Sequence, residues 1–273
     1  MPYATNAADG TRVFFEDDGG AGTPVVLYGG ILDSVDLVRR EPIPLALQDL
    51  AGEFRLIYAD HRGLGRSDKP HEMTSYAMPF QAMDAVAILD ALDIERAHFA
   101  GASYGGRLCF GIGEHAADRV LSLVAGGQQP YAIDPDGPLA RVVSGVLDKT
   151  RHEGAVAFVE ALEAFWEMRL PDDFRPGYLA QDGAAVAAAS EAMLTQGDIS
   201  RDLRAWSAPC LIYLGAGDVD FFEQAQRAAD EIPNAEFVGL EGLDHLGAHF
   251  MSERIIPAVL RTLRSASGRA ISA

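Results

Sequence analysis

Short apolar runs alternate along the chain with segments whose apolar residues recur at helical spacing. The apolar runs, each of which predicts a strand, are residues 13–16, 25–28, 56–59, 97–100, 121–125, 210–214 and 236–238. Helices are predicted over residues 81–92, 107–115 and 255–263. Strands that alternate with helices in this way predict an α/β fold, in which a mostly parallel sheet is covered by helices on both faces.

The pattern changes over residues 128–207, where strand signals vanish. Helical stretches such as 154–168 and 184–194 follow one another there, separated by prolines and glycines. We expect this all-helical segment to be a lid, inserted into the βα repeat after the sixth strand. The chain then divides into a core of residues 1–127 and 208–273 and a lid of residues 128–207.

A serine flanked by glycines follows the strand predicted at residues 97–100. In the sequence Gly101-Ala102-Ser103-Tyr104-Gly105, Ser103 lies between a strand end and a helix start, and the glycines relieve the crowding of such a turn. The turn exposes the hydroxyl above the sheet edge and directs helix-start N–H groups at the group it attacks. An ordinary serine N-cap gives a similar local sequence. The partners of Ser103 therefore decide between the two interpretations.

A serine nucleophile needs a base that takes its proton and a carboxylate that orients the base. His245 is the best candidate base, since it lies in a glycine-containing loop between the last predicted strand and the last helix. Asp218, directly after the strand at 210–214, is the best candidate acid. Loops of this kind meet at the carboxyl edge of an open α/β sheet, where ligands bind.

Other polar residues near these loops are weaker candidates or have structural explanations. Asp220, two residues after Asp218, is an alternative candidate for the acid, and Asp244 is expected to point away from His245. We expect His249 to be a helix residue near the lid or the surface, and His61, in a charged turn, to be structural. The remaining histidines show no paired ligand spacing, so we predict no metal site.

These motifs resemble those of the α/β-hydrolase family, in its lidded form, over nearly the whole chain. The elbow resembles G-x-S-x-G, and residues 60–67 resemble the D-x-R-G-x-G-x-S turn of the family. The order serine, aspartate, histidine along the chain is also that of the family. The resemblance implies an eight-stranded sheet and assigns Ser103 as nucleophile, Asp218 as acid and His245 as base.

The loop after the strand at 25–28 departs from the family pattern. Gly29 stands where the family usually carries a histidine in front of Gly30. The resemblance implies an oxyanion hole made of the backbone N–H groups of Ile31 and Tyr104. Because these donors are backbone groups, the missing histidine need not abolish the hole.

Candidate substrate contacts lie near the predicted strand ends and in the lid. They are Gly30, Asp33, Gln128, Trp166 and Phe221. The lid carries further aromatic side chains, most of which are expected to pack it onto the core, while a minority makes the pocket apolar. We therefore expect a small-molecule, largely apolar substrate.

The charge balance of this 273-residue chain is acidic. Against 22 Lys and Arg it has 40 Asp and Glu, a formal net charge of −18, which argues against nucleic acid and anionic membranes as partners. Cys109 and Cys210 lie in apolar segments, which favours buried free thiols over a disulfide. Because we find neither a signal peptide nor a membrane span, we expect a cytoplasmic location.

The sequence thus predicts a serine hydrolase that cleaves a carboxylic ester or a lactone through an acyl-enzyme, without metal or organic cofactor. Alternatives on the same triad are carbon–carbon bond hydrolysis, a lyase reaction, amide hydrolysis and a cofactor-free peroxidase side activity. A hydrolase-like receptor that binds a ligand without turnover is a further alternative. The serine at the elbow argues against dehalogenases and epoxide hydrolases of this fold, which use aspartate there. Fold and triad fix neither the substrate nor the oligomeric state.

Overall fold

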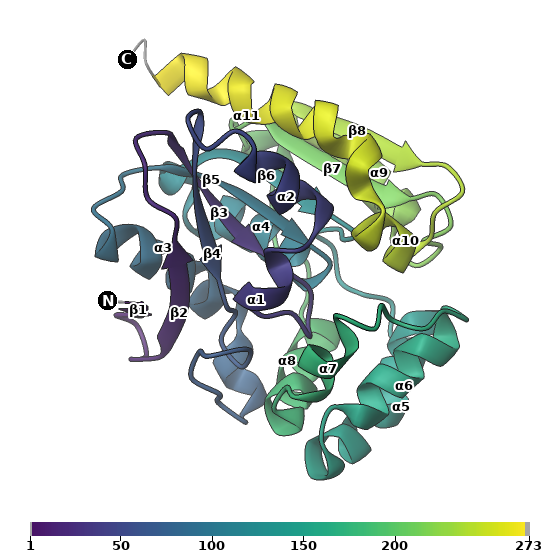
Figure 1. Ribbon diagram of the computed structural model, residues 1–273. Coiled ribbons are helices and arrows are strands. Elements are labelled where there is room, and N and C mark those ends of the chain that lie inside the picture. The colour runs from purple at the N-terminus through teal and green to yellow at the C-terminus, as the bar shows by residue number, and fades with distance from the viewer. Residues whose placement is uncertain (1, 271–273) are drawn as a thin grey trace.

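The computed structural model describes residues 2–270, which are built around one eight-stranded sheet (Figure 1). Its strands are β1 (Tyr3–Thr5), β2 (Arg12–Asp17), β3 (Thr23–Tyr28), β4 (Phe54–Ala59), β5 (Ala97–Ala102), β6 (Val120–Gly126), β7 (Cys210–Gly215) and β8 (Ala235–Leu240). They lie in the order β1-β2-β4-β3-β5-β6-β7-β8. In this described sheet the pairs β1–β2 and β2–β4 are antiparallel, and all other neighbouring pairs are parallel. The predicted fold class is confirmed.

Helices cover both faces of this sheet (Figure 1). One face carries α3 (Met78–Ala91), α4 (Tyr104–His115) and α9 (Phe222–Glu231), and the other carries α1 (Val35–Val38), α2 (Pro42–Gln48), α10 (His245–Phe250) and α11 (Ile256–Ala270). The described chain also contains four short 3-10 helices: η1 (Met73–Tyr76), η2 (Ala117–Arg119), η3 (Leu203–Ala205) and η4 (Ser252–Ile255). Along β3, Val25 and Leu27 belong to one core and Val26 to the other, because successive strand residues face opposite sides.

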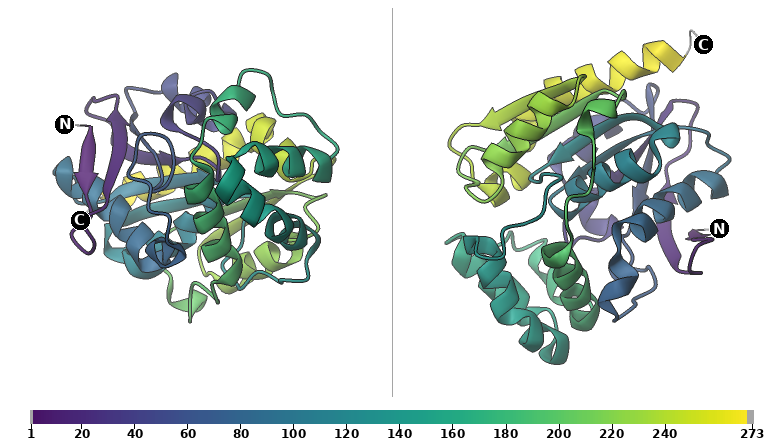
Figure 2. Two further views of the ribbon diagram at one scale, coloured as in Figure 1. Left: turned by 90° about the horizontal axis from the view of Figure 1, so that it is seen from below. Right: turned by 180° about the vertical axis from the view of Figure 1, so that it is seen from behind.

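The segment between β6 and β7 is helical, as the sequence predicts. It consists of α5 (Pro138–Glu153), α6 (Val156–Phe165), α7 (Arg175–Leu179) and α8 (Gly183–Thr195), and we call these four helices the helical insertion. It lies to one side of the sheet, and Figure 2 shows the chain segments that join it to the rest of the molecule.

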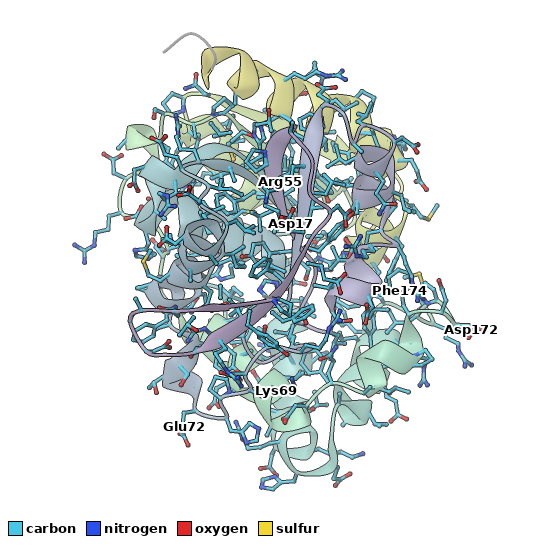
Figure 3. All side chains as sticks on the ribbon, turned by 60° about the vertical axis from the view of Figure 1, so that its left-hand side comes forward. Asp17, Arg55, Lys69, Glu72, Asp172 and Phe174 are labelled. Carbon is cyan, nitrogen blue, oxygen red and sulfur yellow. The ribbon has the colours of Figure 1, made fainter. Side chains whose placement is uncertain are left out.

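Contacts near α7 hold the helical insertion against the loop that follows β3. The Gln181 side chain donates to the Leu32 carbonyl and accepts from the Gly65 N–H, both at 3.0 Å. Phe174, labelled in Figure 3, meets the ring of Phe250 edge to face, with ring centroids 5.1 Å apart. The insertion is therefore anchored beside the carboxyl ends of the parallel strands.

An ion pair links antiparallel β2 to the parallel part of the sheet. Arg55 of β4 and Asp17 of β2 lie side by side in Figure 3, with Nη2 2.5 Å from Oδ2. The hydrogen bond to Arg55 lowers the pKa of Asp17 despite its partial burial, so the pair stays ionised near neutral pH.

The two cysteines are buried and unbonded, as the sequence predicts. Burial raises the pKa of Cys210 to about 12, so its thiol stays protonated. Within residues 2–270, none of the helices has both the length and the apolar character that crossing a membrane requires.

Candidate active site

Ser103 occupies the tight turn between β5 and α4. Its backbone has φ 52° and ψ −115°, a conformation that costs a residue other than glycine about 1–3 kcal/mol. Gly101 and Gly105 make the turn possible, because a Cβ on Gly101 would collide with the backbone of Gly105, and one on Gly105 with the Gly29 carbonyl. The turn presents the Ser103 side chain at the carboxyl edge of the sheet.

Ser103, His245 and Asp218 converge at this edge from three separate segments. His245 is the first residue of α10, and Asp218 follows β7. His245 Nε2 lies 3.0 Å from Ser103 Oγ, and His245 Nδ1 lies 2.6 Å from Asp218 Oδ2. Hydroxyl, imidazole and carboxylate thus form one chain of hydrogen bonds, the arrangement that a nucleophile, its base and an orienting acid require.

Two opposing effects set the pKa of His245. Burial disfavours the charged imidazolium, but the charge and the hydrogen bond of Asp218 outweigh burial, and the pKa is raised above its ordinary value of 6.5. Trp166 stacks on the imidazole, with ring centroids 5.2 Å apart and an angle of 6° between the planes. Phe221 meets the same ring edge to face at 6.2 Å. The ring of His245 is therefore fixed by packing as well as by hydrogen bonds.

Neither of the two other acids considered for the site contacts His245 in this way. Asp244 caps α10, and its Oδ1 atom accepts from the Gly247 N–H at 2.7 Å. Asp220 accepts from the Leu139 N–H at the start of α5, at 3.4 Å. The contact with the imidazole therefore belongs to Asp218.

The loop after β3 is held beside Ser103 by the carbonyl of Gly29. This oxygen accepts from the Gly105 N–H and from His61 Nε2, each at 3.0 Å. Burial lowers the pKa of His61 to about 4, so its imidazole is neutral and acts as a structural donor. In the part of the chain that the structure describes, the N–H groups of Ile31 and Tyr104 donate to no protein acceptor, which leaves both able to donate to a ligand.

Ser103 opens onto a cavity of about 50 Å³. Its lining residues are Gly30, Ile31, Leu32, Asp33, Ser103, Leu162, Trp166, Leu170, Tyr178, His245, Leu246 and His249. Of the predicted substrate contacts, Gly30, Asp33 and Trp166 belong to this lining. Gln128 and Phe221 are buried outside it, and Phe221 packs on His245 instead. Leucine side chains make much of the wall apolar.

The match to known sequences covers more than half of the chain. Residues 23–165 match the model of the family described as the alpha/beta hydrolase fold, and this region contains the elbow and the loop after β3. The chain belongs to the α/β-hydrolase family. The resemblance drawn from the motifs is thereby confirmed, and the arrangement of strands is that of the α/β-hydrolase fold.

Relatives of this α/β-hydrolase span several named activities. A non-heme chloroperoxidase of Streptomyces lividans is 27% identical, covering 94% of this chain and 98% of that protein. The 3-oxoadipate enol-lactonase 1 of Acinetobacter baylyi is 28% identical, covering 62% of this chain and 63% of that protein. A solved thermophilic esterase from Thermogutta terrifontis has a TM-score of 0.79 and 26% identity, covering 97% of this chain and 98% of that chain. The names of these relatives confirm the prediction that the chain is an enzyme of the hydrolase class.

The sequence missed a buried polar cluster beside the cavity of this α/β-hydrolase. His249 is a helix residue, as predicted, and it lines the cavity together with Leu162 and Trp166 of residues 128–207. It is only 8% exposed, so of its two predicted places, near the lid or the surface, the surface is wrong. It lies one turn after His245 and shares its buried helix face. His249 Nε2 lies 3.6 Å from both Asp33 Oδ2 and Glu41 Oε1. Ligand atoms of these three residues lie within 4.8 Å of one another, a spacing that a divalent cation could also use. No motif marks Glu41 or Tyr178, which come to this region only through the packing of α2 and α7.

Proposed function

We propose that this α/β-hydrolase is a serine hydrolase that cleaves a carboxylic ester or a lactone through an acyl-enzyme. The observation that carries the proposal is the hydrogen-bond chain from Ser103 through His245 to Asp218. The relatives named as an esterase and an enol-lactonase support the choice of ester and lactone bonds.

The first half of the reaction acylates Ser103. His245 Nε2 takes the hydroxyl proton as Ser103 Oγ forms a bond to the carbonyl carbon. The N–H groups of Ile31 and Tyr104 hydrogen-bond the resulting oxyanion, and each donor is expected to contribute about 3 kcal/mol to the transition state. The bond to the leaving alcohol then breaks, and the imidazolium of His245 gives the alkoxide its proton.

The second half returns the enzyme to its starting state. His245 takes a proton from water, whose oxygen attacks the acyl carbon. The bond between this carbon and Ser103 Oγ breaks, the proton passes from His245 to Oγ, and the carboxylic acid leaves. With a lactone, acid and alcohol leave as one hydroxy acid. Neither half requires a metal ion or an organic cofactor.

The helical insertion serves as the lid in this proposal, with residues 128–207 as the lid unit and residues 1–127 and 208–273 as the core. Trp166, just after α6, covers the imidazole, and Leu162 and Leu170 contribute to the cavity wall. A cavity with such walls excludes water and favours an apolar group on the substrate.

The test is hydrolysis of p-nitrophenyl acetate and butyrate by the wild type and by Ser103→Ala, with γ-butyrolactone as a lactone substrate. We expect the wild type to turn over and Ser103→Ala to lose at least about 1,000-fold in kcat. Thermal unfolding of both proteins checks that the variant is folded. A folded Ser103→Ala that keeps most of the activity contradicts the proposal, and so does a wild type that binds these compounds without releasing product.

A further inference from the structure

The cavity at Ser103 has a charged wall. Asp33 is 3% exposed and lines the cavity together with Ser103. Its Oδ2 atom accepts from the Gly30 N–H at 2.5 Å, whereas its Oδ1 atom is buried with no hydrogen-bond partner among the described residues. A carboxylate held in this way keeps an acceptor available to whatever enters the cavity.

The groups behind Asp33 do not neutralise it. Glu41 is buried, and burial together with the nearby charge of Asp33 raises the pKa of Glu41 well above its usual range. Burial also lowers the pKa of His249, against the attraction of Asp33. The geometry also favours a net negative cluster, because the carboxyl groups of Asp33 and Glu41 lie against a single imidazole, that of His249.

Among the described lining residues, the groups that can become cationic are the imidazoles of His245 and His249. The lining that the structure describes contains neither lysine nor arginine. Burial first, and then the charge of Asp33, raise the pKa of Tyr178, so its phenol also stays neutral. Like charges repel far more strongly inside an apolar cavity than in water, because little solvent screens them.

We propose that Asp33 is a specificity-determining residue, whose carboxylate excludes substrates with an anionic acyl group and restricts the enzyme to esters or lactones with an uncharged acyl group. The inference rests on the proposed ester or lactone hydrolysis and names the substrate class of that same site. In this proposal the loop after β3 selects substrates by the charge of the acyl group more than by its length.

The experiment compares two esters of the same shape and different charge. Monobenzyl succinate carries a carboxylate on its acyl chain, and benzyl succinamate carries a neutral amide in the same place. Both esters release the same benzyl alcohol, so they differ in the charge of the acyl group alone. The measured quantity is the ratio of kcat/KM for the anionic ester to kcat/KM for the neutral ester, from the release of benzyl alcohol at neutral pH.

Two variants separate charge from structure. Glu41→Gln changes a carboxyl that lies behind Asp33 and outside the cavity lining, and it is the matched control. The double variant Asp33→Asn, Glu41→Gln removes both carboxyl groups, while the amide oxygen introduced by the Asp33→Asn change still accepts from the Gly30 N–H. Any general loss of catalysis from a disturbed loop affects both esters alike and cancels in the ratio.

We expect the wild type and Glu41→Gln to prefer the neutral ester by about tenfold or more. The double variant should raise the ratio by about tenfold, and Asp33→Asn alone serves if the double variant does not fold. An unchanged ratio in the double variant, or equal cleavage of both esters by the wild type, overturns the inference while the proposed function stands. A wild type that cleaves neither these esters nor p-nitrophenyl acetate overturns both.

A bound cation would reverse the charge of this wall. The wild-type ratio should therefore be the same with and without EDTA. A lower ratio in EDTA would show that a metal ion neutralises the pair, and it would overturn the assignment of a negative wall.

Discussion

At the scale of the residue, the proposed mechanism requires a neutral His245, because only a neutral imidazole can take the Ser103 proton. The carboxylate of Asp218, 2.6 Å from Nδ1, favours the charged form and so raises the pKa of His245 above 6.5. The same carboxylate orients the ring and stabilises the imidazolium that forms during the reaction. In the proposed mechanism Asp218 thus stabilises the transition state. The same charge also makes His245 become protonated, and therefore inactive as a base, at a higher pH.

We predict a pH profile that follows from this sign. In the wild type, kcat/KM for a neutral ester should fall as the pH falls through a value above 6.5, where His245 becomes protonated. Asp218→Asn removes the charge that raises the pKa, so its acid limb should move to lower pH, and kcat should fall by about 10⁴-fold, as in another serine enzyme. Steady-state kinetics from about pH 5 to 9 measure both effects.

Asp220→Asn is the matched control for that profile. Its side chain accepts from the Leu139 N–H and makes no hydrogen bond to the imidazole of His245 within the described chain. The charge of Asp220 raises the pKa of His245 less than that of Asp218 does, so the acid limb should move less far to lower pH, with most of the activity retained. A limb that moves as far in Asp220→Asn as in Asp218→Asn would contradict the assignment of the acid.

Which single residues meet at the site was predictable from sequence only where a motif marks them. Ser103, Asp218 and His245 each follow or precede a recognisable strand or helix, and their order along the chain is informative. Glu41 and His249 carry no such mark, because their meeting with Asp33 depends on how α2 and α10 pack on the sheet. Their charge states depend on burial, which no local pattern reports.

At the scale of the element, the turn at residues 60–67 connects β4 to the helices around the site. Arg62 has a fully buried side chain, whose Nε lies 2.6 Å from Asp84 Oδ2 in α3 and whose Nη1 lies 2.7 Å from Asp9 Oδ2. Asp60 accepts from the Val35 N–H at the start of α1, at 2.6 Å. The turn therefore fixes α1, α3 and the N-terminal segment relative to one another.

We predict that Arg62→Ala lowers the free energy of unfolding by about 3–5 kcal/mol, because it leaves the buried Asp84 carboxylate without its partner. Arg12→Ala, which removes an exposed ion pair with Asp68, should cost no more than about 1 kcal/mol. Urea denaturation of the two variants and the wild type measures the difference. An equal decrease in the free energy of unfolding in both variants would show that the buried ion pair stabilises the protein no more than the exposed one.

Elements with a strong local signal were predictable, and those formed by tertiary contacts were not. Every residue of β7 is buried, so the strand is one continuous apolar run. By contrast, β1 has only three residues, two of them exposed, and α1 has four residues. Such short segments become ordered by pairing with β2 or by packing on the sheet, so the sequence did not indicate their bounds.

At the scale of the whole molecule, the formal net charge of −18 is the dominant electrostatic feature. Surface arginines pair with some of the acids, as in the exposed Arg264–Glu53 contact at 2.7 Å. The excess of acids remains, and mutual repulsion of this excess destabilises the compact state. The same excess of negative charge opposes association with nucleic acid, which remains an expectation drawn from composition.

We predict that added NaCl stabilises the protein. Raising the salt from about 10 mM to about 100 mM shortens the screening length from about 30 Å to about 10 Å, which weakens the long-range repulsion first. The midpoint of thermal unfolding should therefore rise. Near the pI of about 4.6, where the net charge vanishes, the same salt step should have little effect. A midpoint that falls with salt at neutral pH would mean that the surface ion pairs outweigh the repulsion.

The positive φ of Ser103 places thermal stability and catalytic activity in conflict at this turn. Glycine tolerates φ 52° without penalty, so a chain optimised for heat resistance alone would carry glycine at this turn. Such a chain would outlast the natural one and catalyse nothing. Thermostabilising mutagenesis of this enzyme must therefore be screened by product formation, since a screen by melting temperature would reward the loss of Ser103, the proposed nucleophile.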